Sequence, residues 1–82
     1  MKIGKVTGSV WSTKKAPALT GQILQTVQCG GQCLVAADLV GAGVGDWVLL
    51  CFGSSARIAA DNVPVDAAIV GILDQEVPNG RQ

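Results

Sequence analysis

The feature that most constrains this chain is a glycine-rich stretch at residues 41–45, Gly-Ala-Gly-Val-Gly, which separates two short apolar runs. Glycine tolerates positive φ and has no side chain to obstruct a neighbour. The backbone must therefore turn tightly here or lie close against another backbone. We expect Gly41, Gly43 and Gly45 to have a structural or interfacial role.

A dinucleotide-binding interpretation of the same glycines needs a helix directly after them and an acidic residue about 20 positions further on. The residues that follow, 46–52, instead predict a strand, and the chain has no phosphate-binding loop of the GKS or GKT kind. The glycines are therefore not typical of a nucleotide site.

The composition limits the size of the fold and shows more apolar residues than one small domain needs. The chain has 82 residues, enough for one domain that buries about 60% of its unfolded surface. Hydrophobic residues make up 49% and charged residues 15%, whereas about 25% charged is typical. The apolar surplus favours a subunit interface.

Charge and aromatic content argue against nucleic acid as a partner. The net charge is zero, no block of like charge occurs, and the chain has one Phe, two Trp and no Tyr, which leaves few groups to bind phosphates or stack bases.

The longest apolar runs, residues 47–52 and 67–73, are far shorter than the roughly 18 residues that span a bilayer. Residues 1–5 lack the apolar core of a signal peptide, so we expect a cytoplasmic protein that binds no membrane.

Cysteine usage agrees with a reducing compartment. Cys29, Cys33 and Cys51 are an odd number, which argues against a closed disulfide framework. Two thiolates near a turn, without any histidine, fall short of a usual four-ligand metal site, and Cys51 fits simple packing in an apolar run. We expect neither a metal nor another cofactor.

Periodicity and punctuation predict five short strands. The first alternates with period two and contains Gly4 and Gly8, which suggest bending or a bulge. A polar loop with a turn at Pro17 follows it, and a glycine hairpin joins the second and third strands. Ser54 or Ser55 is a candidate N-cap for a short helix before the last strand. The predicted strands span residues 2–12, 21–28, 33–37, 47–52 and 67–74, and the helix spans 53–59.

These elements predict an all-β domain over residues 1–75, a small five-stranded OB-like barrel with one short helix, and a short polar C-terminal tail over 76–82. The helix is unusual for an OB fold, since it lies between strands four and five rather than three and four. Residues 48–52 and 67–73 are apolar on both faces, whereas an antiparallel strand in a soluble barrel should alternate. Either another subunit or the chain's own loops and tail must cover the outer faces.

No catalytic arrangement emerges. The chain has no histidine, and its six acidic residues are scattered singly. Ser54 and Ser55, near Arg57, have no base partner and are better interpreted as helix-capping residues. We therefore predict that the protein is not an enzyme.

Four ordered segments resemble a known family. They are residues 1–14, which include MKI and VWSTK, then 37–48, 53–57 and 64–74. In this arrangement the chain resembles the pentameric vertex proteins of bacterial microcompartments, the carboxysome and ethanolamine-utilisation group. The resemblance implies a barrel subunit in a homopentameric ring that caps the corners of a polyhedral shell in the cytoplasm, beside hexameric shell proteins on the facets.

A closed ring needs a heterologous interface, in which one patch meets a different patch on the next copy. We infer that Gly41, Gly43 and Gly45 lie near the subunit contact, and that Ser54, Ser55 and Arg57 lie near it or near the ring axis. Two alternatives remain from the residues alone. One is an OB-type binding module for single-stranded nucleic acid or oligosaccharide, and the other is a small accessory subunit or enzyme with a thiol site.

Overall fold

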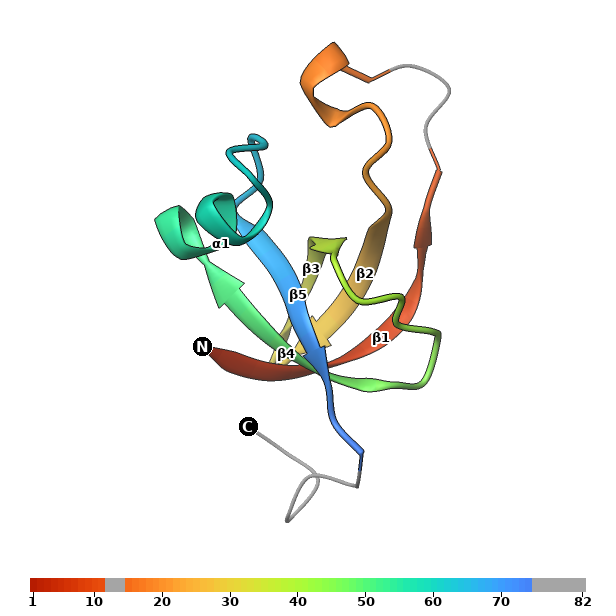
Figure 1. Ribbon diagram of the computed structural model, residues 1–82. Helices are drawn as coiled ribbons and strands as arrows, with labels where there is room; N and C mark the ends of the chain where they lie inside the picture. Colours follow the sequence, from red (N-terminus) through yellow and green to blue (C-terminus); the bar gives the residue numbers. More distant parts are fainter. Residues whose placement is uncertain (12–14, 75–82) are drawn as a thin grey trace.

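Five strands close into a barrel in a computed structural model that describes residues 1–11 and 15–74 (Figure 1). The strand order around the barrel is β1-β2-β3-β5-β4, and only β3 and β5 pair in parallel. The strands are β1 (Lys2–Val10), β2 (Leu24–Cys29), β3 (Gln32–Asp38), β4 (Trp47–Phe52) and β5 (Ala67–Ile72), with a 3-10 helix η1 (Pro17–Leu19) and a helix α1 (Gly53–Ala59). The predicted five-stranded barrel with one short helix is confirmed.

Some ends of the strands and the helix agree with the prediction, and others differ from it by a few residues. The bounds of β4 and α1 are those predicted. The second strand begins at Leu24 rather than at residue 21, because Gly21 has φ +85° and the N–H of Gln22 still donates to the carbonyl of Leu19. The first strand ends at Val10. Residues 12–14 and the tail lie outside the described part, so the domain boundary at 75 and 76 stays a prediction.

The two glycines of β1 act differently. Gly8 lies where the pairing of β1 with β2 shifts register, as the expected bulge requires. Gly4 keeps regular register with β4. A Cβ there would lie 2.6 Å from a methyl of Val27 and 3.0 Å from the carbonyl oxygen of Gln28. Gly4 therefore allows close packing across the barrel and forms no bulge.

The predicted serine N-cap of α1 is wrong. Phe52 is the N-cap, and no side chain makes a capping hydrogen bond. Gly53, with φ +61°, turns the end of β4 directly into the helix, and its N–H donates to the carbonyl of Asp66 at 3.0 Å. The exposed Ser54 and Ser55 already lie inside the first turn, so they are not positioned as caps.

The barrel interior is narrow and filled by small and medium side chains. The largest fully buried residues are Leu50, Ile69, Val6, Val27 and Val48. A second small cluster lies outside the barrel, where Ala56 of α1 packs on Cys51 of β4 and Ala68 of β5. Helix α1 thus covers one end of the outer face of these two strands.

Candidate functional site

The glycine-rich loop between β3 and β4 is held by its own backbone geometry. Gly41 and Gly45 have φ of +78° and +95°, a region in which residues with a side chain are strained. Gly43 has no such φ, and a Cβ there would meet only a carboxylate oxygen of Asp46, at an ordinary 3.7 Å. Two of the three glycines are therefore required by the turn itself, whereas Gly43 has free space around it within the chain.

The loop is attached to β1 through Val6. The N–H of Val6 donates to the carbonyl of Asp46 at 3.0 Å, and the N–H of Gly45 donates to the carbonyl of Val6 at 2.9 Å. Within the loop, the N–H of Gly43 donates to the Asp46 carboxylate at 2.8 Å. These bonds fix the loop on the barrel wall, so its exposed edge is presented in a defined position.

A buried carboxylate organises the first half of the loop. Asp38, at the end of β3, accepts hydrogen bonds from the N–H groups of Val40, Gly41 and Ala42, at 3.1, 2.9 and 2.8 Å. The buried Gln25 amide adds a fourth at 3.1 Å and also donates to the carbonyl of Ala42. The sequence prediction assigned neither residue a role. The available signal was an Asp three residues before the first glycine of the loop, since Asp side chains commonly form Asx-turns with the backbone that follows.

The six predicted contact residues do not form one cluster. Gly41, Gly43 and Gly45 precede β4, whereas Ser54, Ser55 and Arg57 follow it on α1. The loop and the helix thus lie at opposite ends of that strand (Figure 1). Each of the six side-chain or backbone positions is exposed. A single contact at one end of the barrel would therefore use one group without the other.

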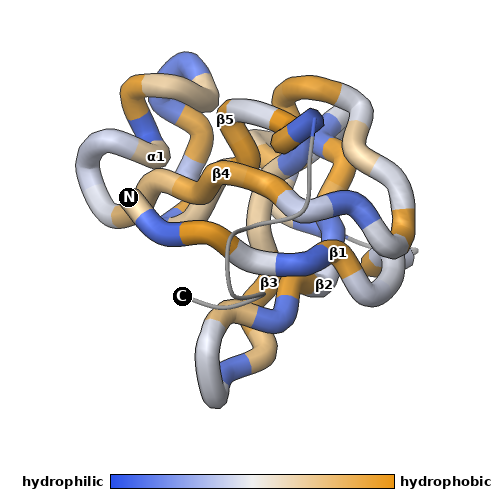
Figure 2. The backbone as a smooth tube through the Cα atoms, turned by 90° about the horizontal axis from the view of Figure 1, so that it is seen from below, coloured by the Kyte–Doolittle hydropathy of each residue, from blue (hydrophilic) through white to orange (hydrophobic). Residues whose placement is uncertain are grey.

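An apolar outer face lies between these two ends. Ile3, Leu49 and Gly71 pair in register across β1, β4 and β5, and Trp47 lies two residues before Leu49, on the same face of β4. Ile3, Trp47 and Leu49 are only half-buried. Helix α1 covers the opposite end of this face and leaves their end open. Lys5 lies over the Trp47 ring at 5.6 Å from its centroid. Figure 2 shows the hydrophobic run along β4.

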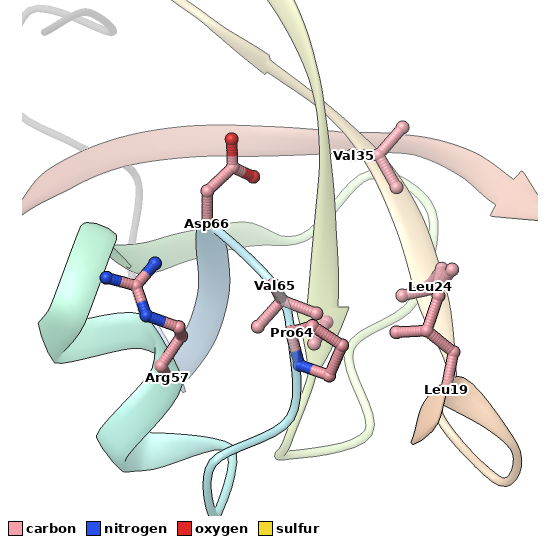
Figure 3. Close-up of a pocket in the computed structure, with 8 residues that line it drawn as sticks. Leu19, Leu24, Val35, Arg57, Pro64, Val65 and Asp66 are labelled. Carbon is pink, nitrogen blue, oxygen red and sulfur yellow. The ribbon is translucent and has the colours of Figure 1, made fainter. Parts of the chain in front are cut away.

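A second apolar surface is concave. An open groove of about 570 Å³ runs between η1, the start of β2 and the second half of β3 on one side and the segment before β5 on the other. Figure 3 shows Leu19 and Leu24 on one wall and Pro64 and Val65 on the other. Arg57, projecting from α1, and Asp66 also line the groove.

Other chemistry is sparse. The three cysteines are free thiols, with Cys29 and Cys51 buried and Cys33 exposed. Within residues 1–11 and 15–74, no cluster of three or more His, Cys, Asp or Glu side chains could hold a metal ion. No helix of the described residues is long and apolar enough to cross a bilayer.

Residues 1–74 match the family described as ethanolamine utilisation protein EutN/carboxysome. The chain belongs to this family. It is 48% identical over 83 residues to the carboxysome shell vertex protein CcmL of Synechococcus elongatus, with 90% of this chain and 84% of the relative covered. It is 41% identical over 90 residues to the microcompartment shell vertex protein EutN of Escherichia coli K12, with 99% and 95% covered.

A solved structure extends the comparison to assembly. The GrpN pentameric microcompartment shell protein of Rhodospirillum rubrum superimposes with a TM-score of 0.82 at 41% identity, covering 92% of this chain and 95% of that chain. Members of the EutN/carboxysome family are shell vertex proteins and not enzymes. The predicted family and the non-enzymatic role are confirmed, and the alternative of an OB-type binding module is not favoured.

Proposed function

We propose that this chain forms a closed homopentameric ring that caps the vertices of a bacterial microcompartment shell, beside hexameric shell proteins on the facets. The observation that carries the proposal is the similarity of the whole barrel to a pentameric shell protein. A flat sheet tiled by hexamers cannot close into a polyhedron, and five-fold units at its corners provide the closure.

The surface chemistry supports a ring. The half-buried outer face of β1, β4 and β5 is apolar, and completing the burial of each large side chain there contributes roughly 1 kcal/mol, about half of the value for full burial, before the entropic cost of association. We propose that the contact also includes the residues inferred from the sequence. These are Gly41, Gly43 and Gly45 on the loop, and Ser54, Ser55 and Arg57 on α1 near the contact or the ring axis.

The direct test is the native mass of the purified protein at several concentrations. Five copies of the 8.3 kDa chain weigh about 41.5 kDa, and we expect a stable species of that mass. A persistent monomer would contradict the ring. Co-expression with hexameric shell proteins tests the vertex role, since closed particles should form with this protein and open sheets or tubes without it.

Substitution of Gly43 tests the loop contact separately from folding. Because Gly43 has open space and no positive φ in the single chain, Gly43→Trp should leave the monomer folded and remove the ring. Gly31→Trp is the matched control, since a Cβ at this hairpin glycine meets nothing within 4 Å and its φ is not positive. A pentamer that persists in Gly43→Trp would show that the loop lies away from the contact.

A further inference from the structure

We infer that the groove between η1 and the segment before β5 is the receiving half of the subunit interface, and that the neighbouring copy inserts the outer face of its β1 and β4 there. This inference rests on the proposed ring and specifies its geometry. The occupant is a second copy of this chain, recognised by an apolar surface centred on its Leu49.

The lining of the groove suits an apolar partner surface. Val35, on the outer side of β3, is 48% exposed, and it lines the groove together with the half-buried Leu24 and Val65. Five of its lining residues are Leu, Val or Pro, drawn from η1, β2, β3 and the segment before β5. Large apolar side chains from four different parts of the fold thus converge on one open surface (Figure 3).

Ring closure needs two different patches on different sides of each subunit. The groove lies over β2 and β3, whereas Leu49 lies on β4. In the closed order β1-β2-β3-β5-β4, strand β4 neighbours β1 and β5 and is never adjacent to β2 or β3. The concave patch and the outer face therefore point in different directions from the barrel, as a heterologous contact requires.

The groove lining carries one cation, Arg57, and one carboxylate, Asp66, and the carboxylate can match a lysine across the contact. Asp66 is an exposed carboxylate that lines the groove. The proposed partner face carries Lys5 on β1, which pairs with Trp47 and whose ammonium group lies over the Trp47 ring, at 5.6 Å from the ring centroid. A lysine held beside the apolar face can meet Asp66 of the next copy, which fixes the register of docking.

The first experiment is a charge placed in the groove. Val35→Glu puts a carboxylate where the neighbour's apolar face should dock, while its exposure in the single chain allows the monomer to fold. We expect the native mass to fall from five chains to one, with an unchanged circular dichroism spectrum. Ile23→Glu is the matched control, since Ile23 is 58% exposed and does not line the groove, and it should keep the pentamer.

Cross-linking identifies the partner surface. In a Cys33→Ser background, the double variant Val35→Cys, Leu49→Cys treated with a flexible bismaleimide should give a ladder of covalent species up to the pentamer. Either single variant should give none, because in a heterologous ring a position does not face its own copy. Cys29 and Cys51 are buried and should not react.

The outcomes separate the two proposals. If the unmodified protein forms no ring, the proposed function fails. If the ring forms but Val35→Glu remains pentameric, the groove receives something other than a second copy and this inference is overturned while the ring stands. Ladders from the single variants would equally overturn it, because they would show a contact between identical patches.

Discussion

Asp38 is expected to be the residue on which the glycine-rich loop most depends, and Asp38→Ala measures that dependence. The substitution removes the acceptor of four hydrogen bonds. The N–H of Ala42 is then buried without a partner, which costs about 1 to 3 kcal/mol. The Gln25 amide retains the Ala42 carbonyl as an acceptor, and the part-buried N–H groups of Val40 and Gly41 can turn to water.

The expected loss is therefore about 2 to 4 kcal/mol in the free energy of unfolding. For a chain of 82 residues the total is about 4 to 12 kcal/mol, so the variant should unfold at a clearly lower urea concentration. The stability of Asp38→Asn should lie between that of the unsubstituted protein and that of Asp38→Ala, because the amide keeps one acceptor oxygen but places an NH₂ group against backbone donors.

The assay is urea unfolding followed by circular dichroism, with all variants at one protein concentration because unfolding of a ring is coupled to its dissociation. Asp46→Ala is the control in the same loop, since its carboxylate accepts one exposed bond from Gly43 and its loss should cost less than about 1 kcal/mol. If Asp38→Ala and Asp46→Ala were equally stable, the buried network would not be what holds the loop.

Two further predictions concern the barrel itself. Gly4→Ala should destabilise by about 1 to 3 kcal/mol through overpacking against Val27, measured by urea unfolding beside the neutral control Gly31→Ala; equal midpoints would contradict the close packing. Iodoacetamide should modify Cys33 once per chain in the native protein while the two buried cysteines react only after unfolding, as mass spectrometry can show; simultaneous labelling of all three would contradict the observed burial.

Local patterns predicted the parts of the fold that local forces decide. The bounds of β4 and α1 follow from one apolar run ended by Gly53, and the bulge in β1 follows from Gly8. The capping prediction failed because the first N–H of α1 finds its acceptor on Asp66, which lies far along the chain. The parallel pairing of β3 with β5 is likewise decided by tertiary contacts, which periodicity does not report.

The candidate site likewise has features that local sequence predicts and features that depend on tertiary contacts. Positive φ at Gly41 and Gly45 was predictable from the glycines, whereas the groove depends on four segments meeting in space. Gln25 was missed because its amide reaches the Asp38 carboxylate only when β2 and β3 pair, with residues 24 and 37 opposite each other. The bonds that Asp38 accepts from the next residues of the chain are local, and the Asx-turn pattern was the available signal for them. A contact surface formed by several strands is visible only after the barrel has closed.

The apolar surplus in the composition can now be located. The barrel core is filled by Val, Leu, Ile and many alanines, and no tryptophan is fully buried. Trp11 is instead 91% exposed, and Val35 on β3 and Ile72 on β5 are about half and two-fifths exposed. The interior of a five-stranded barrel has too little volume for all the apolar side chains of this chain, so the remaining ones lie on its outside. Contiguous exposed apolar surface marks an interaction site, and the same feature that limits the core therefore supplies apolar surface for the proposed ring.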